Sequence, residues 1–175
     1  MGNVLKQQPD YVISQSKWGV TRKYLYESGM LFREFKSHWK MGVLPLVHIT
    51  IGINPETGKR LWAKGVIAIG RKSLGVIAIG QVSAGIIAIS HLSIGVISIG
   101  QLAIGLVLAM GQVSVAGLFS AGQVAVGAIA IGQITAGYYA LGQFAVGKFI
   151  LSVSTQDYEA VSFFKSLWHW CTGLF

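Results

Sequence analysis

The sequence predicts a mainly β protein that is organised around one long internal repeat. Glycine recurs at nearly every fifth position from Gly65 to Gly147, with one-residue slips at Gly111 and Gly117 that predict a bulged coil. Alternate five-residue segments differ in composition, so the true period is ten residues. Residues between the glycines alternate with the two-residue period of a β-strand. A short fixed period is typical of repeat architectures, and we expect a β-solenoid with flanking α-helices.

The two kinds of segment predict which side chains face inward. One kind reads Gly-Val-Ile-Ala-Ile at 75–79, and the other reads Gly-Gln-Val-Ser-Ala at 80–84. The third and fifth positions are apolar in both kinds, so we expect them to point inward and the second and fourth positions to point outward. Glycine at each corner permits the backbone angles of a sharp turn. A ten-residue coil with two arms and a twenty-residue coil with four arms both fit these glycines.

The second position of one kind of segment forms a polar column. Arg71 and His91 belong to it, and its other members are the glutamines Gln81, Gln101, Gln112, Gln123, Gln133 and Gln143. Stacked coils would bring these amides into register, where neighbouring side chains hydrogen-bond as a polar ladder. We therefore expect Gln123→Leu to be tolerated less well than Ser114→Ala.

The second position of the other kind of segment is apolar. Its members include Val66, Val76, Ile86, Val96, Leu106 and Leu118. With two arms per coil, this column and its neighbours form an outer face of roughly 700 Å² at ordinary strand spacings. The largest apolar patch of a soluble monomer is typically ~300–600 Å². We expect this face to bind a second copy of the chain, in a homo-oligomer or filament, or the acyl region of a bilayer.

An all-α polytopic membrane bundle is the alternative fold. From Ser73 to Gly147 the chain contains no Lys, Arg, Asp or Glu, and such a run is long enough for several membrane-spanning helices. The periodicity argues against helices, because a five-residue step rotates by ~500° around a helix axis. Glycines and glutamines would then be spread over every face, whereas helical spans gather small and polar residues on their packing side.

Residues 1–45 are predicted to form a basic amphipathic helical segment. Large apolar residues recur there at four-residue steps, for example Leu31, Phe35 and Trp39. Two roles fit such a helix: it lies in the interface of an anionic membrane, or it covers the open end of the solenoid. The residues expected to contact the membrane are Trp18, Trp39, Arg22, Lys23, Arg33, Lys36 and Lys40.

Residues 46–64 are predicted to be a hairpin that leads into the solenoid at 65–153. The stretch 46–53 alternates as a strand, and the segment from Asn54 to Gly58 combines Pro and Gly in a turn. After the repeat, residues 154–175 are predicted to form an aromatic C-terminal helix. Trp168 and Trp170 lie on it, and it is expected either to cap the last coil or to anchor the protein at a membrane interface.

Composition restricts the functional classes. The net charge of +8 is concentrated in residues 1–72, which favours an anionic lipid membrane as the partner. We expect no nucleic-acid binding, because no recognition motif accompanies the charge. The four histidines are scattered over different segments and the repeat contains no carboxylate. We therefore expect no enzyme activity, no catalytic residue, no metal site and no cofactor.

The repeat and the residues before it resemble a known group of proteins. The residues that carry the resemblance are Leu-Pro-Leu-Val-His-Ile at 44–49, Asn-Pro-Glu-Thr-Gly-Lys at 54–59, and the copies of Gly-Val-Ile-Ala-Ile-Gly that start at Gly65. They resemble bacterial glycine-repeat hydrophobic proteins, most of which are uncharacterised and described as membrane proteins. The resemblance implies bacterial origin and membrane association, and it transfers no functional residue.

Three functions from different classes follow from these expectations. The first is a non-catalytic, membrane-associated scaffolding protein that self-assembles through the apolar face or the ends of the solenoid. The second is a membrane-perturbing or pore-forming effector. The third is a solenoid that recognises an ice or polysaccharide surface, which usually carries a regular Thr or Ser array. We rank the scaffold first and place it at the cytoplasmic face of a bacterial inner membrane.

Overall fold

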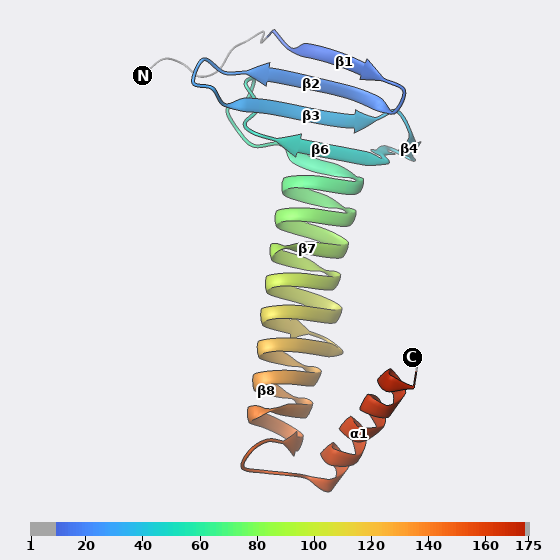
Figure 1. The fold of residues 1–175 in the computed structure, drawn as a ribbon, viewed down its shortest axis with the longest axis vertical. Helices are drawn as coiled ribbons and strands as arrows, with labels where there is room; N and C mark the ends of the chain where they lie inside the picture. The colour runs from blue at the N-terminus through green and yellow to red at the C-terminus, as the bar shows by residue number, and fades with distance from the viewer. Residues whose placement is uncertain (1–9, 174–175) are drawn as a thin grey trace. The chain divides into compact units, whose positions relative to one another are not determined.

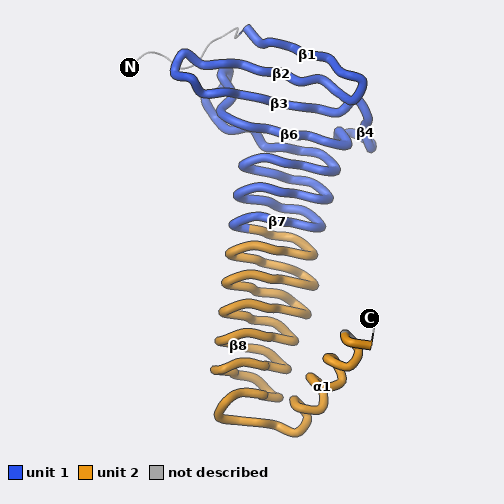
Figure 2. Tube along the Cα trace, in the orientation of Figure 1, with its two compact units in different colours: residues 1–92 blue, residues 93–175 orange. Residues whose placement is uncertain are grey.

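A computed structural model describes residues 10–173 of the chain. Residues 1–9 of the predicted N-terminal segment and residues 174–175 of the predicted C-terminal helix lie outside the described residues. The described chain is mainly β, and its one helix is α1 (Tyr158–Thr172) (Figure 1). It divides into two compact units, residues 1–92 and residues 93–175 (Figure 2).

Unit 1 begins with an antiparallel sheet in which neighbouring strands follow the order β1-β2-β3-β6. These strands are β1 (Val12–Ser16), β2 (Gly19–Leu25), β3 (Leu31–Ser37) and β6 (Val47–Ile51). Between β3 and β6 lies a separate small hairpin of β4 (Lys40–Met41) and β5 (Leu44–Pro45). Tyr24, Tyr26 and Phe32 form the buried apolar core of this sheet.

The helix predicted within residues 1–45 is wrong, because this part of the chain forms strands β1, β2 and β3. On β3, Phe32 and Glu34 are buried, whereas Leu31 and Arg33, each directly before one of them, are exposed. This is the two-residue alternation of a strand. The charged Glu34 occupies a buried position, so the alternation of buried and exposed residues does not appear as an alternation of apolar and polar residues. Gly29, which interrupts the helical pattern, has φ +79° in the turn between β2 and β3.

The hairpin predicted over residues 46–64 is also wrong in its pairing. The turn is present, with the Asn54 amide donating to Lys59 O and the Gly58 amide donating to Asn54 O. The strand that follows does not return antiparallel to β6. Instead β7 (Trp62–Ala116) pairs in parallel with β6, and Val47 lies opposite Ile67. Since β6 also pairs antiparallel with β3, it joins the N-terminal sheet to the start of the repeat within unit 1.

Strands β7 and β8 (Phe119–Leu151) wind in successive turns instead of running straight (Figure 1). In unit 1 the backbone returns against itself after ten residues. A Cβ atom added at Gly75 would overlap the carbonyl oxygen of Gly65, and one at Gly85 would overlap that of Gly75. Residues ten positions apart are therefore stacked neighbours in this unit.

In unit 2 the same stacking runs first at an interval of eleven residues and then at ten. Gly111 lies against Gly100 O, and Leu108 pairs in parallel with Phe119. From Gly132, which lies against Gly122 O, the interval is ten again. The longer interval falls where the sequence predicts a bulge, and the stacking resumes after it.

The side chains enclosed by the winding belong to the fourth position of each segment, except that Ala109 is at the fifth position of the longer segment 105–110. The prediction that the third and fifth positions point inward is therefore wrong. Facing arms leave room only for Ala, Ser and Thr, so side-chain volume decides the inward set. Larger side chains project outward, and Ile134 is 53% exposed. The enclosed residues are Ala68, Ser73, Ala78, Ser83 and Ala88 in unit 1, and Ser93, Ser98, Ala103, Ala109, Ser114, Ser120, Ala125, Ala130, Thr135 and Ala140 in unit 2.

The glycines of the repeat serve a different purpose from the one predicted. Among the described residues, positive φ angles occur only at Gly29, Gly42, Gly52 and Gly58, all of which precede the repeat. Repeat glycines such as Gly132 instead allow the carbonyl oxygen of the stacked segment to approach where a Cβ atom would lie. Close backbone approach, and not backbone angle, requires glycine at these positions.

The C-terminal helix is confirmed, although it begins at Tyr158 and not at residue 154. The segment before it forms a turn, in which the Thr155 amide donates to Ser152 Oγ at 3.0 Å. The alternative fold of helical membrane spans is wrong, because the uncharged run forms strands. Among the residues that the structure describes, no helix combines the length and apolar character that crossing a bilayer requires.

Candidate functional site

Two turns meet at one end of the N-terminal sheet. Antiparallel pairing places Gly19, which follows the turn between β1 and β2, opposite Ser37 at the end of β3. A Cβ atom at Gly19 would overlap Lys36 O, so glycine allows the strands to approach closely here. The His38 amide donates to Trp18 O at 3.1 Å, which ties the two turns together.

The β4–β5 hairpin extends this end of the sheet. Met41 pairs with Leu44 across a two-residue turn in which Gly42 has φ +65°. The Leu46 amide donates to Trp39 O at 2.8 Å, which fixes the hairpin to the end of β3. These contacts hold six side chains at a common end of the sheet, and we name this group the aromatic tip: Lys17, Trp18, Trp39, Lys40, Met41 and Val43.

The apolar members of the aromatic tip face solvent although they are large. The rings of Trp18 and Trp39 touch edge to face, with centroids 5.7 Å apart, yet these residues are 65% and 63% exposed. Met41 is 60% exposed and Val43 is 95% exposed. Hydrogen bonds position these side chains, but no packing within the described chain buries them. Such a patch is typical of a surface that contacts another apolar phase or partner.

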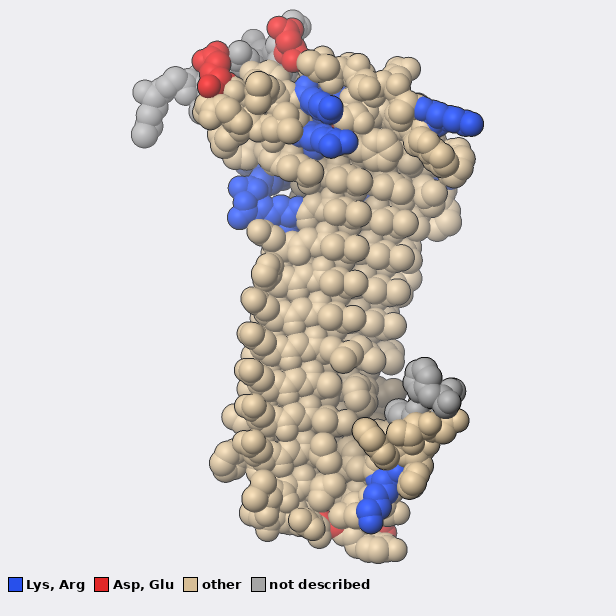
Figure 3. Space-filling view, in the orientation of Figure 1, with Lys and Arg blue, Asp and Glu red and all other residues tan. Residues whose placement is uncertain are grey.

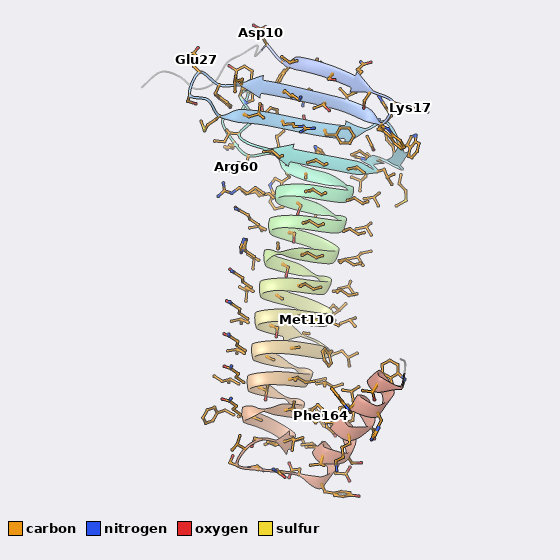
Figure 4. The ribbon with its side chains drawn as sticks, viewed as in Figure 1. Asp10, Lys17, Glu27, Arg60, Met110 and Phe164 are labelled. Carbon is orange, nitrogen blue, oxygen red and sulfur yellow. The ribbon has the colours of Figure 1, made fainter. Side chains whose placement is uncertain are left out.

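Charge around the aromatic tip is positive. Lys17 and Lys40 are both exposed, and Figure 4 places Lys17 at the opposite end of the sheet from Glu27. Residues 19–37 contain two acidic residues, Glu27 and Glu34, and Glu34 is buried. In Figure 3 basic side chains gather on unit 1, while the visible surface of β7 and β8 is nearly free of charge. The tip therefore combines exposed indole rings with cations.

Glu34 organises the sheet behind the tip. It is 2% exposed and lies opposite Arg22 on β2. Arg22 Nε donates to Oε2 at 2.9 Å, and Lys36 Nζ lies 2.8 Å from Oε1. His48 Nε2 lies 3.1 Å from Oε1, and the Lys64 amide donates to His48 Nδ1 at 2.8 Å. We infer that His48 carries its proton on Nε2 and donates to the carboxylate.

These contacts determine the protonation of Glu34. Burial by itself raises the pKa of the carboxyl, but hydrogen bonds from His48, Lys36 and Arg22 outweigh burial and hold this pKa well below its ordinary value. Burial by itself lowers the pKa of Arg22, but the hydrogen bond to the Glu34 carboxylate and its charge outweigh burial and raise this pKa. Glu34 is therefore a fully engaged structural anion that ties β2, β3 and β6 together.

The structure divides the basic residues that the sequence predicts to bind a membrane. Arg22 and Lys36 are engaged by Glu34. Lys23 and Arg33 lie opposite each other on β2 and β3, on the other face of the sheet, and both are exposed. Lys40 belongs to the aromatic tip, so the predicted residues that come together there are Trp18, Trp39 and Lys40.

The two predicted columns of the repeat lie next to the glycine corners. In unit 1 Ile86 is 52% exposed and Val66 and Val76 are half-buried; in unit 2 Leu106 is 70% and Leu118 52% exposed, and Val96 is half-buried. The glutamines of the polar column are exposed. Arg71 donates to Gln81 Oε1. Within the described residues no glutamine amide of this column bonds to another. In unit 2 the glutamines of the polar column are Gln101, Gln112, Gln123, Gln133 and Gln143.

Trp168 and Trp170 lie on α1 in unit 2 and are 69% and 68% exposed. Lys17, Met41 and Val43 were not predicted as site residues, because residues 1–45 were predicted to be helical. A signal for Met41 and Val43 was Gly42, since glycine at the first of two turn residues suits a hairpin. The enclosed column was not predicted either, although every enclosed residue is Ala, Ser or Thr.

No protein-family model matches this chain, and neither a curated protein nor a solved structure matches it. The resemblance to bacterial glycine-repeat hydrophobic proteins therefore stays a prediction.

Proposed function

We propose that this chain is a non-catalytic, membrane-associated structural protein that binds anionic lipid through its aromatic tip. The observation that carries this proposal is the ordered but uncovered pair of Trp18 and Trp39 beside Lys17 and Lys40. Indole rings favour the membrane interface, where the apolar ring is buried and the N–H stays hydrated. Each lysine near an anionic leaflet contributes about 1 kcal/mol to binding.

The apolar residues at the turn of β4 and β5 strengthen the same site. Burying an exposed Val or Met side chain is worth ~1.5–3 kcal/mol. Val43 is 95% exposed and Met41 is 60% exposed, so both have most of this energy to gain on insertion. The internal hydrogen bonds of the tip hold the side chains in place before binding, which reduces the entropy lost on contact.

We infer that β7 and β8 form a β-solenoid with ten-residue coils, and that its exposed aliphatic columns drive self-assembly. The ten-residue stacking of glycines in each unit supports a two-arm coil over a twenty-residue one. Outward Ile86 in unit 1 and outward Leu106 in unit 2 supply the apolar surface for a second copy of the chain. In this proposal the protein is a scaffold attached to a membrane, and its location at the cytoplasmic face of a bacterial inner membrane stays a prediction.

Binding of the full chain to vesicles tests the aromatic tip. Vesicles of phosphatidylglycerol and phosphatidylcholine are sedimented with the protein and with the double variant Trp18→Ala/Trp39→Ala. The matched control is Trp62→Ala, because Trp62 is also exposed, at 42%, but lies outside the tip. We expect the tip variant to lose most of its binding and the control to bind normally. Equal loss in both variants, or no loss in either, would contradict the tip assignment.

A charge variant separates lysine contacts from indole contacts. Replacing Lys17 and Lys40 by Glu removes about 2 kcal/mol of attraction and adds repulsion. We expect binding to weaken by at least roughly thirty-fold at low salt, since ~1.4 kcal/mol is a factor of ten. Lys59→Glu/Arg60→Glu changes charge equally in an exposed turn outside the tip and should lose less. Dye release is recorded in the same samples, and leakage with normal binding would favour the pore-forming function.

A further inference from the structure

Unit 2 contains an apolar cleft between α1 and the outer face of the wound strands. Its volume is about 570 Å³, and every residue that lines it is apolar or aromatic. The wall on the strand side consists of Leu108, Phe119, Ile131 and Leu141, and the wall on the helix side includes Phe164 and Trp168. Figure 4 shows Phe164 between α1 and the strands.

Two contacts fasten α1 to the strands of unit 2 near the beginning of the helix. The Ile150 amide donates to Asp157 Oδ2 at 2.8 Å, just before the helix starts. Phe163 stacks on Tyr139, with ring centroids 4.0 Å apart. One turn later Trp168 is still 69% exposed, although it lines the cleft. The helix thus contributes apolar side chains to a space that the described residues leave open.

A second cleft of about 470 Å³ adjoins the first, and the two share Phe164 and Trp168 as a wall. Its lining adds the polar side chains of Gln156, Lys165 and His169. Within the described residues these three side chains make no hydrogen bond or ion pair with the protein. His169 lies in the last turn of α1. Because Lys165 is a cation, a positive charge lies beside the apolar cleft.

We propose that these two clefts bind one long-chain fatty acid. The hydrocarbon tail occupies the cleft lined by Leu108, Ile131 and Leu141, and the carboxylate lies at Lys165 and His169. A methylene group takes about the volume of a liquid water molecule, ~30 Å³, so the apolar cleft holds at most ~19 methylenes. The volume also lies within the ~300–1,000 Å³ typical of small-molecule sites. An apolar tail with a single anionic group matches both walls.

Quenching of tryptophan fluorescence tests this proposal. Full-length protein is titrated with dibromostearate, whose bromines quench nearby indoles, in the absence of vesicles. Trp168→Phe identifies the signal that comes from the cleft. The variant Ile131→Phe/Leu141→Phe fills the cleft, and Ile134→Phe is the matched control on an exposed position that does not line it. We expect the cleft variant to bind at least tenfold more weakly and the control to bind normally.

A second comparison tests the carboxylate site without touching the apolar wall. Stearate and methyl stearate are compared as competitors that displace dibromostearate. Lys165→Glu should weaken competition by stearate at least tenfold and leave competition by methyl stearate unchanged. If the variant weakens competition by both ligands equally, or by neither, the placement of the carboxylate is overturned. Equal quenching in the cleft variant and the wild type would show adsorption to exposed aliphatic columns and would overturn the site. None of these variants changes the aromatic tip. The vesicle test of the tip is therefore independent of the result of the fatty-acid titration.

Discussion

At the scale of single residues, Glu34 is a buried charge that connects three strands of unit 1. Its carboxylate is buried and accepts hydrogen bonds from Arg22, Lys36 and His48, which lie on three strands. A buried anion is tolerated only when such partners replace its hydration. Removing the anion leaves Arg22 and a buried histidine without their acceptor.

We predict that Glu34→Gln lowers the free energy of unfolding of unit 1 by about 3 kcal/mol at neutral pH, because breaking a buried ion pair typically costs ~3–5 kcal/mol. Urea unfolding followed by near-ultraviolet circular dichroism of Tyr24 and Tyr26 measures the change. Asp10→Asn removes an exposed carboxylate and should have little effect. Equal unfolding midpoints for Glu34→Gln and the wild type would show that the cluster is energetically neutral.

The depressed pKa of Glu34 also predicts a pH dependence. A carboxyl whose pKa is lower in the folded state stabilises the fold above its unfolded pKa, and this stabilisation is lost as the pH falls toward the folded pKa. The ordinary value is 4.5, so stability should fall progressively below about pH 4.5. Thermal midpoints recorded from pH 7 to pH 3 should decline less in Glu34→Gln than in the wild type. Parallel curves would contradict the assignment.

The polar residues of the repeat reverse an expectation from the sequence. Ser114 is fully buried, and its hydroxyl lies 2.7 Å from Ser120 Oγ, whereas the exposed Gln123 has no amide partner among the residues that the structure describes. We predict that Ser114→Ala lowers the thermal midpoint more than Gln123→Leu does. The reason is that Ser114→Ala loses a buried hydrogen bond, which contributes about 1 kcal/mol to the free energy of unfolding. A greater loss in Gln123→Leu would restore the amide ladder that the sequence suggests.

At the scale of elements, the enclosed column decides how the wound strands pack. Ala130 is fully buried between facing arms, while Ala136, at a fifth position six residues later, faces outward and is half-buried. Identical substitutions at these two sites compare the inside of the winding with its outside.

We predict that Ala130→Leu destabilises unit 2 by more than ~2 kcal/mol, because overfilling a packed interior typically costs ~1–3 kcal/mol and three methyl-sized groups are added here. Ala136→Leu should change stability by less than about 0.5 kcal/mol, as surface substitutions usually do. Chemical denaturation of both variants provides the measurement. The opposite order would mean that the fifth position faces inward.

At the scale of the whole molecule, charge and apolar surface are separated along the chain. The net charge of +8 belongs to residues 1–72, and the run from Ser73 to Gly147 carries no Lys, Arg, Asp or Glu. In the proposed function, the basic residues of unit 1 attract anionic lipid, while the exposed indoles of the tip and the aliphatic columns of the repeat make apolar contacts. The two contributions respond differently to salt, because screening weakens the first and not the second.

We predict that binding to anionic vesicles weakens by at least tenfold between about 0.05 M and about 0.5 M NaCl, since the screening length falls severalfold over this range. Binding to uncharged phosphatidylcholine vesicles should be weaker and nearly independent of salt. Sedimentation with both kinds of vesicle provides the comparison. Salt-independent binding to anionic vesicles would mean that apolar insertion alone holds the protein on the membrane.

Local residue patterns were sufficient to predict the repeat, its strand character and the C-terminal helix. The strands of the repeat follow from periodicity, because a five-residue glycine interval cannot stay on one face of a helix. The helix follows from the aromatic segment that contains Trp168 and Trp170. The turn at Asn54 and Gly58 was also predictable from its Pro and Gly chemistry. Each of these features depends on residues that are close together in the chain.

Contacts between distant residues determine which side chains of the repeat are enclosed, how residues 10–51 fold and where Trp18 meets Trp39. Alternation permits either set of positions to face inward, and the choice depends on the distance between arms that are ten residues apart. Likewise Glu34 is compatible with a buried strand position only because Arg22 and His48 reach it from neighbouring strands. These outcomes depend on contacts across strands, which local residue patterns do not contain.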